Sequence, residues 1–386
     1  MAGTAATRIA TIVGGGVGGL CAAIALRQAG IEATVYERAD MLGDVGAGLV
    51  VWTNAVRVLR ELGLADAVLA GGSPIEHGQV RTSDGSVLAR SEPGELTRRF
   101  GLPTVAIHRA ALHRALLSAL PEGAVRLGAS CVAVSEDADG TTARFSSGEE
   151  ARADVLVGAD GIRSVVRGAL FPEVKLRYSG YTAWRGAVET KDEVALGLTS
   201  ETWGRGNRFG IVRLDGERVY WYATANTEPG RTRPAAETKA LLLRTFGGWH
   251  HPIGHLLEGT PADVILHNDI HDIPPMPRWS RGRITLLGDA AHATTPNLGQ
   301  GACMAIESAF VLARSLAASG DVPSALAAYE AARRERTAWI TNQSWRIGVV
   351  GQWENPLACA VRDFATRLSG SAMKAQLFRT VSGGPA

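Results

Sequence analysis

The sequence predicts an α/β fold that carries an inserted mixed β-sheet and ends in helices. Three observations predict this arrangement. A β-branched run, a glycine cluster and an apolar helical pattern occupy residues 8–30. Short strands with concentrated aromatic residues fill residues 176–280, and a strand with two helices follows at 281–347. Strands that alternate with helices form parallel sheets, so both ends of the chain are expected to build one sheet around the insertion.

Composition limits the functional classes. The chain has 386 residues, and a prior of roughly 150 residues per domain predicts about two domains. Its 40 basic and 38 acidic residues leave a net charge of +2, without the basic excess of nucleic-acid-binding proteins. The four cysteines form no Cys-x-x-Cys pair, which favours a cytoplasmic protein and argues against a zinc ribbon. No metal site is predicted, because His250, His251 and His255 lack acidic partners.

The first uncharged stretch allows two interpretations. Residues 9–26 are 18 residues without a charge, which is the lower limit for a membrane span or a signal peptide core. Five of these residues are glycines. Each interior glycine destabilises a helix by about 0.5–1 kcal/mol relative to alanine. We therefore expect a strand, a tight turn and a helix instead, and no membrane association.

The remaining elements follow from apolar periodicity and turn residues. A strand at 33–36 closes at Glu37, after a helix that Gly30 ends. The other expected elements are a loop and helix in 41–70, hairpin-like pieces in 71–99, a helix at 108–120, strands at 125–134, 142–145, 153–157, 181–188, 208–213, 218–224, 263–266 and 283–287, a helix after Gly301 and a helix over 323–347.

The first chemical motif is Gly14-x-Gly16-x-x-Gly19. Such glycines allow a tight turn, a close approach of the backbone to a pyrophosphate, and close packing of helix on strand. The helix N-terminus favours the phosphate charge. Glu37, at the end of the next strand, is placed to accept hydrogen bonds from a ribose hydroxyl and argues against a 2′-phosphate there. The motif in this context predicts a Rossmann-like dinucleotide site.

A second motif follows the strand at 153–157. The strand leads into Gly158-Ala159-Asp160-Gly161, with basic residues just beyond. Asp160 has two interpretations, as a contributor to a nucleotide site or as the N-terminal cap of the next helix. The residues alone favour the cap.

A third motif follows the strand at 283–287. Gly288-Asp289 is followed by a loop from Pro296 through Gly299 and Gln300 to Gly301. Asp289 can hold a ribityl or ribose hydroxyl. The helix that begins after the two loop glycines can direct its N-terminus at a flavin carbonyl, where negative charge develops on reduction.

These three motifs, in this order, resemble those of the class A flavoprotein monooxygenases over about residues 8–345. The resemblance implies a FAD site of the glutathione-reductase type. It also implies NAD(P)H as co-substrate without a separate nucleotide domain, and the sequence has no second Gly-x-Gly-x-x-Gly in a strand–helix context. The residues assigned to FAD are Gly14, Gly16, Val17, Gly18, Gly19, Glu37, Arg38, Val50, Arg109, Val132, Asp160, Asp289, Pro296, Gly299, Gln300, Gly301 and Ala302.

Within that class the chain is similar to salicylate and hydroxybenzoate hydroxylases, FAD-dependent urate hydroxylase and zeaxanthin-epoxidase-like enzymes. The run Tyr181-x-x-Trp184-Arg185-Gly186 resembles the entry into their substrate sheet. In the urate enzymes an aspartate follows the proline of the third motif. Asn297 stands there in this chain, which argues against urate. Flavin halogenases are not favoured, because their lysine and their WxWxIP stretch are absent from this sequence.

Arg185, Arg208 and Tyr220 are the candidate catalytic residues. The two arginines, with Arg213, lie on inserted strands and can hold an anionic or phenolate substrate, although surface arginines would look the same. Tyr220 and Tyr222 share one face of a strand, which fits a binding wall or ordinary core packing.

The expected activity is that of an FAD-dependent, NAD(P)H-consuming monooxygenase. Through a flavin hydroperoxide it inserts one oxygen atom of O2 into an aromatic or polycyclic small molecule. Ring hydroxylation is favoured over epoxidation or N-hydroxylation, and a flavin oxidoreductase without oxygen insertion is the alternative. A monomer or homodimer is expected. The predicted FAD-binding domain comprises residues 1–70, 106–175 and 281–345, the substrate domain comprises 71–105 and 176–280, and 346–386 form a helical segment.

Overall fold

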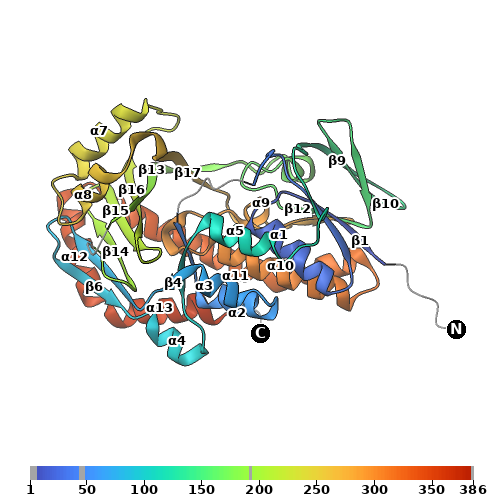
Figure 1. The fold of residues 1–386 in the computed structure, drawn as a ribbon, viewed down its shortest axis with the longest axis horizontal. Helices are drawn as coiled ribbons and strands as arrows, with labels where there is room; N and C mark the ends of the chain where they lie inside the picture. Colours follow the sequence, from blue (N-terminus) through green and yellow to red (C-terminus); the bar gives the residue numbers. More distant parts are fainter. Residues whose placement is uncertain (1–6, 43–47, 191–193, 384–386) are drawn as a thin grey trace.

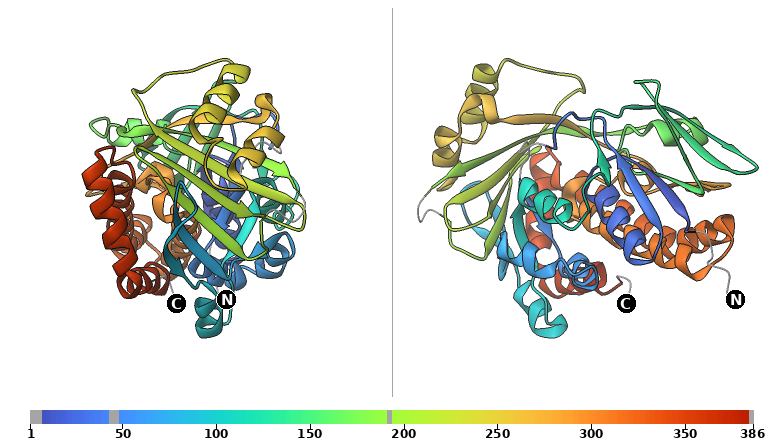
Figure 2. Two further views of the ribbon diagram at one scale, coloured as in Figure 1. Left: turned by 90° about the vertical axis from the view of Figure 1, so that its left-hand side faces the viewer. Right: turned by 45° about the vertical axis from the view of Figure 1, so that its right-hand side comes forward.

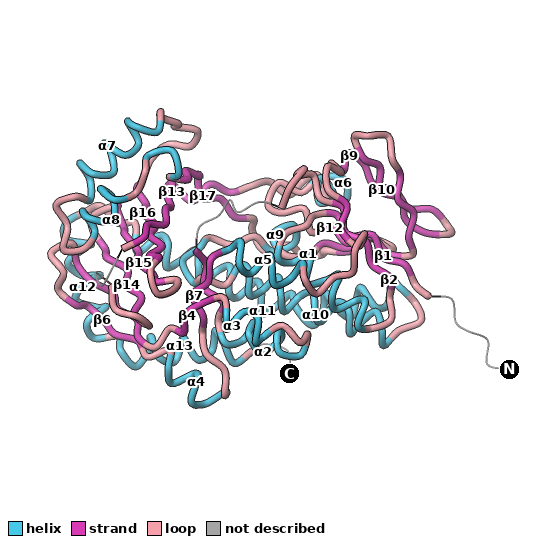
Figure 3. Tube along the Cα trace, in the orientation of Figure 1, coloured by secondary structure: helices cyan, strands magenta, loops and turns pink. Residues whose placement is uncertain are grey.

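The computed structural model describes residues 7–42, 48–190 and 194–383. Two sheets lie at opposite ends of the molecule (Figure 1). One is a six-stranded sheet and the other a seven-stranded sheet. Helices fill the region between and below the two sheets, and two further helices lie on the outer side of the seven-stranded sheet, as the colours in Figure 3 show. The predicted α/β fold class with an inserted mixed sheet is confirmed.

The six-stranded sheet is parallel apart from one edge strand. Val13 pairs with Tyr36 on one side and with Gly158 on the other, so the carboxyl ends of three neighbouring strands lie level. All three predicted motifs therefore meet at one edge of the sheet. In spatial order the strands are β18 (Ser280–Arg281), β19 (Ile284–Leu286), β12 (Val155–Gly158), β1 (Ile9–Val13), β2 (Glu32–Tyr36) and β8 (Val125–Arg126).

The first uncharged stretch forms β1 and α1 (Val17–Gln28), which confirms the strand–turn–helix prediction. Helix α10 (Gly301–Ala318) is the one helix of the described segments that is long and apolar enough to cross a membrane. It packs against α1, α2 (Thr53–Glu61) and α11 (Val322–Gly351), as Figure 2 illustrates. Ten of its 18 residues are buried, as in the core helix of a folded domain.

The seven-stranded sheet has two different faces. On the outer face, Trp184, Phe209 and Trp221 pack with Phe246 under α7 (Ala235–Phe246) and α8 (Ile253–Gly259). Alternation along the strands turns the candidate catalytic residues to the opposite, inner face. In spatial order the strands are β17 (Leu266–Asp272), β13 (Arg177–Glu189), β16 (Arg218–Asn226), β15 (Asn207–Arg213), β14 (Leu198–Trp203), β5 (His77–Thr82) and β6 (Val87–Ser91).

Two small antiparallel sheets complete the β-structure. One contains β3 (Gly48–Val51), β7 (Val105–His108) and β4 (Gly72–Pro74), and the other contains β9 (Cys131–Asp137), β10 (Gly140–Phe145) and β11 (Glu150–Ala153). The remaining helices are α3 (Ala65–Ala70), α4 (Gly94–Phe100), α5 (Arg109–Leu117), α6 (Val165–Leu170), α9 (Asp289–His292), α12 (Pro356–Leu368), α13 (Gly370–Ser382), η1 (Ala262–Val264) and η2 (Pro296–Leu298).

Two predicted strands are wrong in extent. The strand expected at 125–134 is divided, because Gly128 takes a positive φ of 69° and the chain leaves the parallel sheet after β8. Of the strand expected at 263–266, Asp263 and Val264 belong to the short helix η1, and the strand β17 begins at Leu266, two residues after the helix ends.

Other differences concern helices. The helix expected at 108–120 ends at Leu117, and His108 caps it by accepting a hydrogen bond from the Ala110 amide at 3.3 Å. Helices α7 and α8 were not expected, because the aromatic strands around them dominated the pattern. Strand β3 was also missed, since it has only four residues and α2 begins directly after it, at Thr53.

Candidate functional site

The glycine turn between β1 and α1 is shaped by the first motif. Gly14 has a φ of +109°, and a Cβ there would overlap the carbonyl oxygen of Ala159. A Cβ on Gly19 would overlap the carbonyl oxygen of Gly14, and one on Gly18 would press on Leu287. These three positions therefore need glycine for packing within the protein.

Gly16 differs from the other motif glycines. An added Cβ at this position meets no heavy atom within 4 Å. Gly16 precedes α1 without a side-chain cap, and the first turn, which begins at Val17, contains no acidic residue. The first amides of a helix lack partners within the helix. The turn thus offers open space in front of N–H groups that suit a pyrophosphate.

Glu37 lies against this turn at the end of β2. One of its carboxylate oxygens accepts a hydrogen bond from the Gly15 amide at 2.6 Å, and the other accepts one from the Ala39 amide at 3.0 Å. The side chain is half-buried, and the adjacent Arg38 is exposed. A fixed carboxylate beside the phosphate turn can accept further hydrogen bonds from ribose hydroxyls.

Asp160 in the second motif acts as a cap. Its carboxylate accepts hydrogen bonds from the Val165 amide at 2.7 Å and the Val166 amide at 3.2 Å at the start of α6. The Ser164 hydroxyl donates to it as well. The Asp160 side chain therefore caps α6, which is the interpretation that the residues alone favoured.

A buried arginine joins the second and third motifs. Arg167 on α6 donates to the main-chain oxygens of Asp289 at 3.4 Å and Ala290 at 3.1 Å. Its other terminal nitrogen donates to the Ile162 carbonyl oxygen. These bonds hold the loop after β12 to the loop after β19. Sequence reasoning missed Arg167, because its acceptors are main-chain atoms.

Asp289 begins α9 at the same edge, with an exposed side chain. It is nevertheless surrounded by enough protein that burial raises the pKa of its carboxyl group, while Arg109 and Arg167 act in the opposite direction. Arg109, at the start of α5, therefore lies within electrostatic range of Asp289, and its side chain is exposed. The structure brings together two residues that are far apart in sequence.

The loop from Pro296 to Gly301 collects unsatisfied polar atoms. Among the described residues, Gln300 Nε2, Thr294 Oγ1 and Trp52 Nε1 are buried without a hydrogen-bond partner. Trp52 lies against the loop, since a Cβ on Gly299 would be 3.0 Å from its Nε1. Gly299 itself is left-handed, with a φ of 61°. Buried polar atoms are rarely left unpaired, so these atoms are available to hydrogen-bond a ligand or water at this loop.

Helix α10 starts at this loop without a side-chain cap or an acidic residue in its first turn. Gln300 is oriented by Asn54, whose Nδ2 donates to Gln300 Oε1 at 3.0 Å and to Glu307 Oε1 at 2.6 Å. Glu307 is fully buried and pairs with Arg333 at 2.6 Å. Trp52 and Asn54 belong to no sequence motif. They are identified as part of the site only because the start of α2 lies beside this loop in the structure.

Three more residues that the sequence assigns to FAD lie around the carboxyl edge of the parallel sheet. Val50 is half-buried on β3 and packs beside Tyr220. Val132 is 53% exposed near the start of β9. Ala302 is half-buried in the first turn of α10.

The inner face of the seven-stranded sheet reaches the same loop. The Tyr181 hydroxyl donates to Asn297 Oδ1 at 3.2 Å, and Asn297 Nδ2 donates to the Ser344 carbonyl oxygen at 2.8 Å. Burial raises the pKa of Tyr220, while Arg185 opposes this shift through its charge and a hydrogen bond. Arg185 also donates to Asn268 at 3.3 Å.

The other candidate arginines already have protein acceptors. Arg208 is 2% exposed and donates to Glu201 at 3.0 Å and to Gln352 at 2.8 Å. Burial lowers the pKa of Arg208, whereas the negative charge of Glu201 raises it. The net effect is a raised pKa. Arg213 donates to the carbonyl oxygens of Val194, Asp215 and Gly216, so its role is structural. Of the three arginines, Arg185 has the most exposed side chain.

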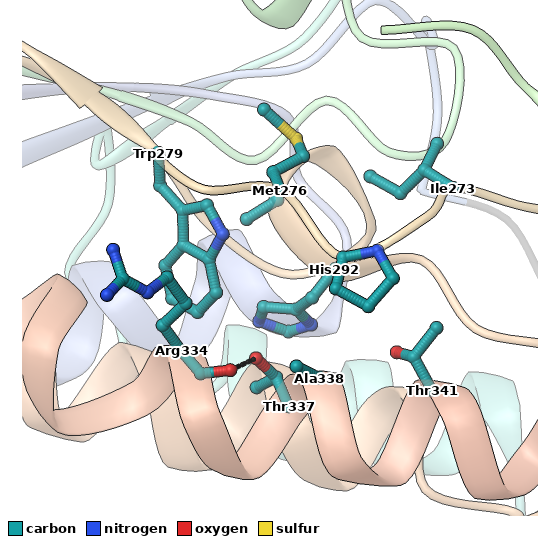
Figure 4. A pocket seen from close by; sticks show the side chains of 10 residues that line it. Ile273, Met276, Trp279, His292, Arg334, Thr337, Ala338 and Thr341 are labelled. Atoms are coloured by element: carbon teal, nitrogen blue, oxygen red, sulfur yellow. Dashed lines mark hydrogen bonds between the residues drawn. The ribbon is translucent and has the colours of Figure 1, made fainter.

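A small cavity lies between residues 273–279, the end of α9 and α11 (Figure 4). It has a volume of about 10 Å³, which is about the space of one water molecule. His292 lines it, with Nε2 at 3.1 Å from Ser308 Oγ and its ring 5.2 Å from that of Trp279. Burial and the charge of Arg333 lower the pKa of His292 to about 3. The cavity is too small for an aromatic substrate.

Comparisons with known proteins agree with this geometry. The family described as FAD binding domain matches residues 6–344. Aurachin C monooxygenase/isomerase of Stigmatella aurantiaca is 44% identical over 93% of this chain and 94% of that protein. 2-Heptyl-3-hydroxy-4(1H)-quinolone synthase of Pseudomonas aeruginosa is 37% identical over 95% of each chain.

Solved structures show the same fold. HpxO of Klebsiella pneumoniae, complexed with FAD and uric acid, superimposes with a TM-score of 0.91 at 31% identity over 98% of this chain and 97% of that one. A salicylate hydroxylase substrate complex matches with a TM-score of 0.77 at 23% identity over 98% and 99%, which supports the fold alone.

The residues at the carboxyl edge of the parallel sheet fit FAD. The open space beside Gly16, the uncapped N-termini of α1 and α10, and the unpartnered atoms around Gly299 suit a ligand with phosphates at one end and a polar ring at the other. The chain therefore belongs to the FAD-binding-domain family of class A flavoprotein monooxygenases and is an FAD-dependent monooxygenase.

Proposed function

We propose that FAD lies along the carboxyl edge of the six-stranded sheet. In this arrangement the turn at Gly16 and the N-terminus of α1 hold the pyrophosphate. Glu37 accepts hydrogen bonds from the adenosine ribose, Asp289 holds a ribityl hydroxyl, and the loop at Gly299 receives the flavin ring. The open space at the turn and the unpartnered atoms at the loop support this placement.

The proposed division of the chain follows from this placement. The FAD-binding domain comprises 1–70, 106–175 and 281–345, the substrate domain comprises 71–105 and 176–280, and 346–386 form a helical segment. The six-stranded sheet, which takes strands from all three FAD-binding segments, supports the first part of this division.

Bound FAD stores two electrons and activates O2, and the protein supplies position and electrostatics. The N-terminus of α10 stabilises negative charge on the ring that it faces. Burial raises the pKa of Tyr220 and that of Tyr222, so both hydroxyl groups remain protonated at neutral pH. Arg185 donates to Tyr220, which leaves the tyrosine proton free to donate to a substrate oxygen.

The substrate is a bicyclic aromatic ring of the 4-quinolone type. The observation that carries this proposal is the 37% identity, over 95% of both chains, to an enzyme named for a 3-hydroxy-4(1H)-quinolone product. The inner face supports it, because Tyr181, Tyr220 and Tyr222 lie on this face and Asn297 stands where the resemblance gives urate enzymes a carboxylate. NADH or NADPH supplies the electrons and O2 the oxygen atom, in a cytoplasmic monomer or homodimer.

A ligand panel tests this function. The FAD-loaded protein is given NADH or NADPH with 4(1H)-quinolones, hydroxybenzoates, urate or polycyclic phenols, while NAD(P)H oxidation, oxygen uptake and product mass are followed. A quinolone is expected to stimulate oxidation strongly and to gain 16 Da, the mass of one oxygen atom. Stimulation by a hydroxybenzoate or urate, with no response to quinolones, would contradict the proposed substrate.

A further inference from the structure

One buried ion pair lies on the inner face of the seven-stranded sheet. Arg208 on β15 and Glu201 on the neighbouring β14 are joined by an Nη1–Oε1 hydrogen bond of 3.0 Å. The two side chains are 2% and 23% exposed. A buried guanidinium without a counter-charge is strongly unfavourable, so Glu201 compensates the charge of Arg208.

The Glu201 carboxylate is held in place by additional donors. Trp203 Nε1 donates to Glu201 Oε1 at 3.1 Å, and the Tyr222 hydroxyl is also hydrogen-bonded to this carboxylate. On the other side of the arginine, Gln352 at the end of α11 accepts the Arg208 Nε–H at 2.8 Å. Neither charge can turn away without breaking several hydrogen bonds.

The pair lies close to the proposed flavin loop. The guanidinium carbon of Arg208 is 5.3 Å from the centre of the Tyr181 ring. The Tyr181 hydroxyl bonds Asn297, which is two residues before Gly299. A charge at Arg208 is therefore separated from this loop by the Tyr181 side chain alone, in a buried region where electrostatic interactions are weakly screened.

The charge state of the neighbouring arginines determines how the Arg208–Glu201 pair affects the inner face. Arg213 is enclosed by main-chain oxygens, and Arg185 bonds Asn268 and Tyr220. With Glu201 present, Arg208 adds no net charge. Arg213 is five positions from Arg208 on β15, so alternation along the strand turns it to the opposite face. Among the described residues, Arg185 is therefore the one of the three arginines that lies on the inner face without a carboxylate partner. Without Glu201 the same face would carry a second uncompensated cation.

We propose that Glu201 is a specificity-determining residue that cancels the charge of Arg208 and thereby selects an uncharged ring over a ring that carries a carboxylate. This proposal rests on the proposed function, whose substrate region is the inner face. It narrows the substrate class to neutral bicyclic rings. Glu201 acts through Arg208 and Tyr222, so it positions charge and takes no part in the chemical step.

The test uses two ligands that differ by one carboxylate, 4(1H)-quinolone and 4-quinolone-2-carboxylate. Their dissociation constants for the FAD-loaded protein are measured from the change in flavin absorbance, so turnover is not required. Glu201→Gln is expected to favour the carboxylate ligand by about tenfold or more, relative to the neutral ligand and to wild type. Arg208→Gln is expected to move the ratio about tenfold in the opposite direction, because it leaves Glu201 uncompensated.

Three controls isolate charge from structure. Glu201→Asp keeps the charge, and the double variant Glu201→Gln/Arg208→Gln removes both charges, so each is expected to retain the wild-type ratio. Glu228→Gln breaks an exposed pair with Arg231 and is expected to leave the ratio unchanged. A merely structural role for Glu201 would shift the ratio in the same direction in both single variants.

The outcomes separate this proposal from the proposed function. Ratios within twofold of wild type in both FAD-loaded single variants, or shifts of the same sign, would overturn the role of Glu201. A wild-type enzyme that binds quinolones but oxygenates none would refute the proposed substrate and leave the charge effect measurable.

Discussion

The carboxylate of Glu37 accepts a hydrogen bond from the main-chain amide of Gly15 at 2.6 Å. The acid at the end of the second strand therefore orders the glycine turn after the first strand. A Cβ on Gly15 would be 3.0 Å from the Glu37 Cβ, so the two segments are packed closely as well as hydrogen-bonded. One side chain thus fixes the glycine turn, and in the proposed FAD site the same carboxylate is the acceptor for the ribose.

Glu37→Gln is expected to weaken FAD binding by roughly tenfold or more. The change removes charged hydrogen bonds, each of which contributes about 1.5–3 kcal/mol. FAD fluorescence quenching measures the dissociation constant. Glu32→Gln, at the exposed start of the same strand, is the matched control and is expected to bind FAD like wild type. Equal affinity in the two variants would show that Glu37 does not contact the cofactor.

Gly16→Ala separates folding from cofactor binding. The apoprotein is expected to unfold at the wild-type temperature, because the new methyl group meets no atom within 4 Å. The FAD dissociation constant is expected to rise at least tenfold, because this methyl group occupies the space in front of the α1 amides. Differential scanning calorimetry and FAD titration give the two values.

Gly168→Ala on α6 is the control for Gly16→Ala. It also has open space, and alanine is favoured in a helix by about 0.5–1 kcal/mol. It is therefore expected to stabilise the protein slightly and to leave FAD affinity unchanged. An unchanged FAD affinity in Gly16→Ala would refute the proposed position of the pyrophosphate.

His292 is expected to make stability depend on pH. Burial and Arg333 lower its pKa to about 3, whereas the unfolded chain has a histidine pKa of about 6.5. Between these values the unfolded state binds more protons. The stability that the neutral ring provides is complete above about pH 6.5 and is lost as the pH falls towards 3, by at most about 1.4 kcal/mol per pH unit.

Urea unfolding between pH 7.5 and 4.5 measures this dependence. His292→Asn, which cannot titrate, is expected to be less stable at pH 7.5 but to show a shallower loss as the pH falls. His255→Asn on α8 serves as the control and is expected to keep the wild-type slope. Parallel curves for wild type and His292→Asn would contradict the lowered pKa.

Asn297→Asp is expected to lower stability without creating urate hydroxylase activity. An aspartate would place a carboxylate oxygen against the Ser344 carbonyl oxygen, which now accepts the Asn297 amide at 2.8 Å. Loss of such a buried donor costs about 1–3 kcal/mol. Thermal unfolding is compared with Asn207→Asp at the start of β15, and urate-dependent NAD(P)H oxidation is measured. Efficient urate turnover by Asn297→Asp would refute this account of the position.

The sequence predicted the parts of the fold that depend on local signals. The turn at Gly14 needs a positive φ, and the apolar strand before it and helix after it are local patterns, so β1 and α1 were predicted correctly. The register that brings Val13 level with Gly158 is not local. It nevertheless follows from a parallel sheet in which β1, β12 and β19 each lead into a glycine-containing motif.

The charge partners could not be predicted. Gln352 contacts Arg208 although 144 residues separate them, and it lies just past the end of a helix without any motif. Glu201 lies on a short strand whose pairing with β15 sets its position opposite Gly210. Sequence patterns identified Arg208 as a candidate but gave no means to see that its charge is compensated.

The central claim is the insertion of one oxygen atom from O2 into a quinolone-type ring. The most direct test supplies the FAD-loaded enzyme with NAD(P)H, a 4(1H)-quinolone and ¹⁸O₂, and determines the product mass. We predict one ¹⁸O atom in a hydroxylated product and one equivalent of NAD(P)H oxidised per product. NAD(P)H oxidation that yields only hydrogen peroxide, or product oxygen derived from water, would contradict the account.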